Sequence, residues 1–293
     1  MGHALRLSRF VLQCSEHTVD SSVLICHGLL GSKQNWKSIS RVLSQKMCGT
    51  IVAVDLRNHG ESPHSNYMSY ADMCRDITLV VDDLKLRNVC LVGHSMGGKA
   101  VMYAALTEPD KYDKLVVLDI SPAPKPAAQS VLSLIDLMSS VDLEEMGRKC
   151  GNNAAVVRNT LMTDWKEPVP DSIVRGFLLT NLDERNGKLL WRVNLDAVRK
   201  FWQQISNFPN EKVNGHVFDR PALFIASSKG GYLDASDVPA IRNYFPQARI
   251  LQIANTGHWV HFDAPNALIS LITSFIQEES VNIKSFIDVT ELQ

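Results

Sequence analysis

A serine, a late histidine and several aspartates have the types and the order that nucleophilic catalysis requires. Gly93-His94-Ser95-Met96-Gly97 is a G-x-S-x-G segment between a strand-forming run and a helix-forming run. A serine at such a junction lies on a sharp turn that lifts its hydroxyl off the sheet, and the flanking glycines keep strand and helix from colliding. We therefore predict that Ser95 is a nucleophile that forms a covalent acyl-enzyme with a carbonyl substrate.

A serine nucleophile needs a general base, and three of the nine histidines follow Ser95, namely His216, His258 and His261. His258 comes just after the last expected strand, where a loop can reach the carboxyl edge of a parallel sheet. After an elbow of this kind, the acid and then the histidine follow the serine along the chain. We therefore predict His258 as the base.

The acid that orients this histidine has several candidates. It usually lies in the loop after the penultimate strand, but here the usual positions hold no aspartate, and Asp234 and Asp237 come several residues later. Asp119 ends the strand beside the nucleophile strand, so its carboxylate could reach the far side of His258. Asp196 belongs to a later helical segment that could reach in from above. We prefer Asp119, then Asp196, and then Asp234 or Asp237.

The oxyanion of an acyl-transfer reaction needs N–H donors, which the backbone can supply. The segment His27–Ser32 (HGLLGS) follows the first clear strand, and its His-Gly turn can aim the N–H of Leu29 at the substrate oxygen. The N–H of Met96, directly after Ser95, is the expected second donor. The pattern indicates neither a cofactor nor a metal.

Alternating strands and helices must position these groups. The expected strands, rich in Val, Ile and Leu, are 22–26, 50–56, 88–93, 114–120, 221–226 and 248–254. The expected helices of the core are 36–46, 69–86, 96–108 and 266–277. This alternation predicts a three-layer α/β fold with a mostly parallel sheet flanked by helices.

The alternation breaks between residues 122 and 219, where helical patterns such as Val131–Met138 and Ala154–Met162 replace strands. We predict a helical cap inserted between the strands 114–120 and 221–226, numbered 6 and 7, of one α/β core, rather than two tandem domains. The expected units are a first core part (1–121), the cap (122–219), a second core part (220–278) and a C-terminal tail (279–293).

Two further segments allow two interpretations each. Residues 1–15 contain two arginines and no acid, which is typical of a mitochondrial transit segment, or they form an opening strand with Leu5, Leu7 and Val11 on one face. We favour the strand. In Asp55–Ser62 (DLRNHGES), the residues Asp55, Arg57 and His59 either line the site, or Asp55 and Arg57 form an ion pair that locks the loop. We favour the ion pair.

Composition argues against several classes of protein. The chain has 30 Lys+Arg and 31 Asp+Glu, so its formal charge of −1 does not suggest a nucleic-acid binder. No apolar run approaches the ~18 residues that span a bilayer, so we expect no integral membrane protein. None of the six cysteines forms a C-x-x-C pair. We therefore expect buried thiols in a reducing, intracellular compartment.

Over residues 22–278 the chain resembles the α/β-hydrolase superfamily. The stretches that look like its abhydrolase-domain-containing protein 11 group, which includes bacterial short-chain acyl esterases, are HGLLGSKQNW, DLRNHGESPHS, GHSMGGKAVM, LDISPAP, LLTNL, WRVNLDAV and TGHWVHF. The resemblance implies Ser95 as nucleophile and His258 as base. Both Asp119 and Asp196 match fixed motifs of the group, so the acid stays open. The chain departs from the group at Gly230, where some members have a polar residue.

The resemblance also implies a capped serine hydrolase that acts on lipid-like acyl esters, diacylglycerol among them, and mitochondrial residence for the animal members. We predict hydrolysis of a small-molecule or lipid ester, with Phe177, Trp191 and Trp202 of the cap in an apolar acyl tunnel, in the mitochondrion or the cytoplasm. The alternatives are thioester, amide or carbon–carbon hydrolysis on the same scaffold, or a non-catalytic binding or stabilising protein. A dehalogenase or epoxide hydrolase needs a carboxylate at the elbow, which Ser95 replaces.

Overall fold

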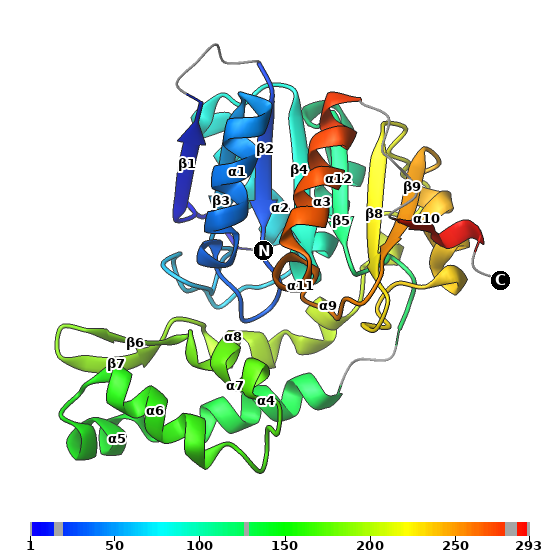
Figure 1. Ribbon diagram of the computed structural model, residues 1–293. Coiled ribbons are helices and arrows are strands. Elements are labelled where there is room, and N and C mark those ends of the chain that lie inside the picture. Colours follow the sequence, from blue (N-terminus) through cyan, green and yellow to red (C-terminus); the bar gives the residue numbers. More distant parts are fainter. Residues whose placement is uncertain (1, 15–19, 126–128, 279–285, 292–293) are drawn as a thin grey trace.

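A single eight-stranded sheet, in the order β1-β3-β2-β4-β5-β8-β9-β10, forms the centre of the molecule (Figure 1). The computed structural model describes residues 2–14, 20–125, 129–278 and 286–291. The strands are β1 (Arg9–Gln13), β2 (Ser22–Cys26), β3 (Thr50–Val54), β4 (Val89–His94), β5 (Lys114–Leu118), β8 (Ala222–Ser227), β9 (Ala248–Ile253) and β10 (Ile287–Asp288). The inner strands from β3 to β9 run parallel, and β1 and β10 pair antiparallel at the two edges.

Helices cover both faces of this sheet, as the alternating pattern predicted. On one face lie α1 (Lys37–Met47) and α12 (Pro265–Gln277), and on the other lie α2 (Tyr70–Leu84), α3 (Met96–Thr107) and α10 (Val238–Tyr244). Successive strand residues point to opposite faces. In β2, for example, Val23 joins the core under α1 and α12, whereas Leu24 joins the core under α2 and α3. The predicted α/β fold is confirmed.

Between β5 and β8 the chain leaves the sheet and forms a layer below the carboxyl ends of the parallel strands (Figure 1). The helices of this layer are α4 (Gln129–Ser139), α5 (Leu143–Cys150), α6 (Ala154–Asp164), α7 (Ser172–Leu179), α8 (Leu195–Lys200) and α9 (Trp202–Ser206). A separate hairpin of β6 (Leu182–Arg185) and β7 (Lys188–Trp191) lies among them. We propose residues 122–219 as a cap carried by one core.

The N-terminal segment packs on the core, but its strand is shorter than the sequence suggested. Only residues 9–13 pair with β3, and Leu7, which is buried, precedes the strand. Phe10 and Leu12 pack on the core under α1 and α12, so Val11 lies on the opposite face, toward the core that Leu5 and Leu7 contact, but it is 40% exposed there. Because β1 is a short strand at the edge of the sheet, the face that carries Val11 is left to solvent. The expected tail lies partly outside the described residues, although β10 extends the sheet at β9.

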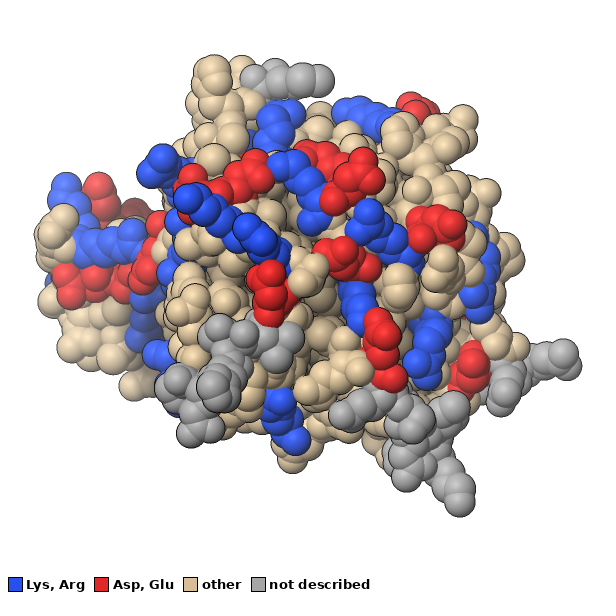
Figure 2. Space-filling model, turned by 90° about the horizontal axis from the view of Figure 1, so that it is seen from above, with Lys and Arg blue, Asp and Glu red and all other residues tan. Residues whose placement is uncertain are grey.

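Charged side chains of both signs are interspersed on the face seen from above, at the amino ends of the parallel strands (Figure 2). The expectation of buried thiols holds for Cys26, Cys74 and Cys90, whereas Cys14, Cys48 and Cys150 are only partly buried. Within the described part of the chain, none of the helices combines the length and the apolar character that crossing a membrane requires.

Candidate active site

Ser95 lies on the strained turn between β4 and α3. Its backbone has φ 52° and ψ −115°, a conformation that costs energy and that is concentrated at functional sites. Glycine is needed on both sides, because a Cβ on Gly93 would collide with the backbone of Gly97, and a Cβ on Gly97 would collide with the backbone of Cys26 and His27. The spacing of the G-x-S-x-G segment therefore has the steric origin inferred from the sequence.

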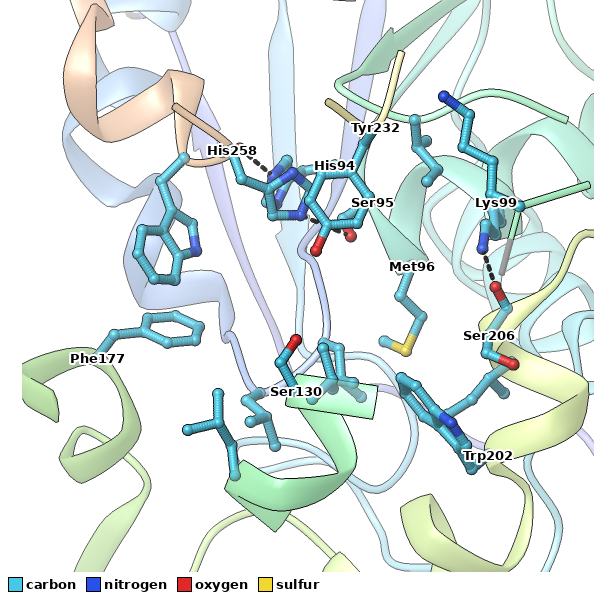
Figure 3. A pocket seen from close by; sticks show the side chains of 18 of the residues that line it. His94, Ser95, Met96, Lys99, Ser130, Phe177, Trp202, Ser206, Tyr232 and His258 are labelled. Carbon is cyan, nitrogen blue, oxygen red and sulfur yellow. Dashed lines mark hydrogen bonds between the residues drawn. The ribbon is translucent and has the colours of Figure 1, made fainter. Parts of the chain in front are cut away.

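The structure brings Ser95, His258 and Asp119 together (Figure 3 shows the first two). The Nε2 atom of His258 lies 3.0 Å from the Oγ of Ser95 and can accept its proton. On the other side of the ring, Nδ1 donates to the Oδ2 of Asp119 at 2.8 Å. Asp119 is fully buried. Its hydrogen bond to Nδ1 holds the imidazole in the tautomer that leaves Nε2 free to act as a base.

Ser227, at the end of β8, holds the carboxylate of Asp119. Its backbone N–H and its hydroxyl donate to Oδ1 of Asp119, at 2.9 and 2.7 Å. The Oγ atom of Ser227 also accepts from the N–H of Gly230 at 2.9 Å. A Cβ on Gly230 would collide with both Ser227 and Asp119. The glycine at this position therefore makes room for a buried carboxylate, and Ser227 is a positioning residue that sequence reasoning missed.

We expect Ser227→Ala to lower kcat about tenfold or more, because a hydrogen bond to a charged group is worth about 1.5–3 kcal/mol. Loss of this bond lets the carboxylate of Asp119 turn away from the imidazole. Steady-state ester hydrolysis checks this, with the neighbouring variant Ser228→Ala as the control, since Ser228 is exposed and its Oγ accepts, among the described residues, from the N–H of Thr256 alone. Equal rates for the two variants would contradict the role of Ser227.

The other candidate aspartates lie away from His258. Asp196 is exposed in the first turn of α8. Asp234 and Asp237 form ion pairs with Lys125 at 3.2 and 2.8 Å. In the described ranges, Asp119 is the aspartate that contacts His258.

The two remaining late histidines have other environments. His216 is exposed, in the segment that leads to β8. His261 is partly buried and stacks on Trp36, with 4.9 Å between ring centroids. Burial lowers the pKa of His261 to about 4, so its ring is neutral. Neither histidine takes the position that His258 occupies beside Ser95.

The backbone N–H groups of Leu29 and Met96 are available for an oxyanion. Met96 is the first residue of α3, where no intrahelical acceptor exists, and the N–H of Leu29 has no acceptor among the described residues. The next residue, Leu30, has φ 59° and donates its N–H to the Nε2 of His59 at 3.2 Å. Burial lowers the pKa of His59 to about 3, so the ring stays neutral and able to accept.

The loop around His59 is locked by ion pairs, but not by the one predicted. Asp55 contacts the Nζ of Lys33 at 2.6 Å, and Arg57 contacts Asp76 at 2.7 Å, so the predicted Asp55–Arg57 pair is wrong. The two side chains reach partners on η1 (Lys33–Trp36) and α2 that lie close only after folding. The structural interpretation of this segment holds, because the pairs fix the loop that supports Leu30.

His94 contacts the loop that carries His258. Burial holds the pKa of His94 well below its usual range, so the ring is neutral. Its Nε2–H donates to the backbone carbonyl of His258 at 2.8 Å, and the two rings lie 4.7 Å apart. This contact was not foreseen, because the sequence places the two histidines far apart in the chain.

Comparison with known proteins identifies the family. Residues 21–140 match the model of the α/β hydrolase fold family. The sn-1-specific diacylglycerol lipase ABHD11 of Danio rerio is 36% identical over 260 residues, which are 88% of this chain and 79% of that protein. The chain belongs to the α/β-hydrolase family. Esterase YbfF of Escherichia coli is 31% identical, over 88% of this α/β hydrolase and 94% of YbfF.

A solved structure supports the same assignment. The structure of a marine microorganism esterase superposes on this α/β hydrolase with a TM-score of 0.82 at 30% identity, covering 93% of the hydrolase and all of the esterase chain. The insertion between β5 and β8 therefore belongs to a fold that the two chains share over nearly their whole length.

A cavity of about 300 Å³ lies beside Ser95, between the sheet and the insertion that joins β5 to β8 (Figure 3). Its lining is mainly apolar and includes Leu29, Met96, Val131, Leu134, Val174 and Phe177. Trp202 also lines it, as predicted, but Trp191 does not and stacks on Trp165 instead. The predicted acyl tunnel is therefore wrong for Trp191. The Oγ of Ser95 is reached through this cavity.

Proposed function

We propose that the chain hydrolyses carboxylic esters of lipid-like acyl groups through a covalent acyl-enzyme on Ser95. The observation that carries the proposal is the continuous hydrogen-bond chain from Ser95 through His258 to Asp119 at the wall of an apolar cavity. The names of the relatives, a diacylglycerol lipase and several esterases, agree with ester substrates.

The proposed reaction has two halves. As the Oγ of Ser95 attacks the ester carbon, His258 accepts its proton, and Asp119 stabilises the imidazolium that forms. The N–H groups of Leu29 and Met96 donate to the oxyanion. His258 then protonates the leaving alcohol. In the second half, His258 deprotonates a water molecule, which attacks the acyl-enzyme and releases the carboxylic acid and Ser95.

The cavity suggests which acyl groups fit. Its volume of about 300 Å³ lies at the small end of pockets that bind small molecules. We therefore propose short to medium acyl chains, on glycerol or on simpler alcohols, as the substrate class. Long chains would have to extend beyond the apolar lining into solvent and would gain no further binding energy there.

A graded series of p-nitrophenyl esters, from acetate to palmitate, tests this proposal. We expect kcat/KM to rise from acetate to medium length and to rise no further for palmitate, because each buried methylene contributes about 0.8 kcal/mol only until the cavity is full. The same acyl groups as thioesters and amides, assayed in parallel, separate the alternative reactions. A folded protein that hydrolyses none of them would instead support a non-catalytic binding role.

We also propose an intracellular location, in the mitochondrion or the cytoplasm. The thiols of Cys26 and Cys90 agree with a reducing compartment, because both are fully buried in the sheet. Burial raises the pKa of the Cys90 thiol to about 12, so it stays protonated and unreactive.

A further inference from the structure

A buried lysine lies in the wall of the apolar cavity. Lys99 follows Ser95 by one turn of α3, and its backbone N–H donates to the carbonyl of Ser95 at 3.0 Å. Residues four apart lie on the same helix face, so the side chain of Lys99 is directed toward the cavity, which it lines. The residue is only 9% exposed. A charged group so deeply buried is costly unless it is paired.

The protein pairs this ammonium group only in part. Its Nζ donates to the backbone carbonyl of Ser206, at the end of α9, at 2.6 Å. An ammonium has three protons to donate, so two are left. In the described part of the chain, no carboxylate forms an ion pair with Lys99. Burial alone lowers its pKa to about 8, and the group is therefore still mostly charged at neutral pH.

A second donor lies on the same side of the cavity. Trp202 lines the cavity next to Ser206, and its indole Nε1 is buried with no acceptor among the described residues. Figure 3 shows Lys99, Trp202 and Ser206 on one side of the pocket, and Phe177 on the opposite side. The Lys99 ammonium therefore brings free hydrogen-bond donors to one wall of a mainly apolar cavity, whereas the Nε1 of Trp202 is covered.

We infer that this cavity takes acyl groups that end in a carboxylate, and that Lys99 binds this carboxylate while Ser95 attacks the ester. The substrates would be monoesters of dicarboxylic acids. A carboxylate fits better than a hydroxyl, because only an anion offsets the buried positive charge. The inference rests on the proposed function, since Ser95 defines which end of the substrate reacts.

Lys125 is the other cation of the cavity, but its charge is already balanced. It forms ion pairs with Asp234 and Asp237, at 3.2 and 2.8 Å, and its side chain is 28% exposed. A carboxylate at Lys125 would compete with two aspartates and with water. Lys99 is only 9% exposed and pairs with no carboxylate in the described ranges, so the inference assigns the anion to Lys99.

Binding to the inactive variant Ser95→Ala tests the inference without turnover. Isothermal titration calorimetry would compare monomethyl suberate with methyl octanoate, which differ in the terminal carboxylate. Adding Lys99→Met is expected to weaken the binding of monomethyl suberate about tenfold or more, because a buried charge pair is lost. It should not weaken the binding of methyl octanoate. Lys99→Gln, which can still donate to Ser206, should give the same loss.

Two further variants sharpen this result. Lys111→Met removes an exposed lysine that pairs with Asp82 on the surface, and it should leave both affinities unchanged. The inference is overturned if both Lys99 variants weaken the two esters equally, or if Lys125→Met causes the selective loss instead. Turnover of methyl octanoate by the unaltered protein is a separate measurement, so failure of the proposed function can be told apart from failure at Lys99.

Discussion

Ser95→Ala is expected to lower kcat for ester hydrolysis by about 10⁴- to 10⁶-fold, the range seen when a serine nucleophile is removed. The variant lacks the atom that forms the acyl-enzyme, while the oxyanion donors and the cavity stay in place. Steady-state hydrolysis of a medium-chain p-nitrophenyl ester measures the loss. Thermal unfolding should change little, because alanine meets the same backbone strain at this turn as serine does.

Ser130→Ala is the matched control for this loss. Ser130 also lines the cavity, on the cap side (Figure 3), and it is exposed. We expect its activity to stay within about threefold of the unaltered protein, as for surface substitutions that break no buried contact. Activity of Ser95→Ala close to that of Ser130→Ala would mean that another group is the nucleophile.

Asp119→Asn is expected to lower kcat by about 10⁴-fold, because an amide cannot hold the imidazole in the productive tautomer. The Oδ1 of the new side chain can still accept from Ser227, which leaves its NH₂ group facing the Nδ1 of His258. That NH₂ favours the tautomer with the proton on Nε2, which cannot take the proton of Ser95. The same steady-state assay measures the loss.

Asp196→Asn is the control for this substitution, with an exposed carboxylate on α8. It should change kcat less than about twofold. If Asp196→Asn abolishes turnover and Asp119→Asn does not, the orienting acid is Asp196 and the cap must close over His258 during catalysis.

The sequence could predict those parts of the fold and of the site whose structure is set by a local sequence pattern. The runs that became β2, β4 and β5 are apolar on both faces. The G-x-S-x-G segment predicts its own turn in part because Gly93 is required by a contact with Gly97, although Gly97 is required by the distant end of β2. The position of His258 could be predicted for a similar reason, since it directly follows the last inner strand.

Which aspartate orients His258 depends on contacts between distant segments, and no local pattern in the sequence records them. Asp119 and His258 are 139 residues apart in the chain, and Asp196 follows an equally distinctive motif. Only the pairing of β5 with β4 and β8 puts Asp119 next to the histidine loop. Ser227 and His94 were missed for the same reason, because each acts on a residue brought near by the fold.

The predicted Asp55–Arg57 pair is the opposite kind of error, because a local pattern suggested a contact that the fold does not make. Two opposite charges two residues apart suggested an ion pair, but in this turn-rich loop each side chain contacts a different element instead. Each found its partner in another element, Lys33 for Asp55 and Asp76 for Arg57. Long charged side chains are therefore poor guides to local contacts, although their burial still shows that this loop is held rigidly.

Covalent labelling tests the central claim, that Ser95 is an activated nucleophile, most directly. The unaltered protein would be treated with a fluorophosphonate, and the adduct located by mass spectrometry of the intact chain and of its peptides. We predict one adduct per chain, on Ser95, and none in Ser95→Ala. An adduct on a different residue, or no adduct on protein shown to be folded, would contradict the account.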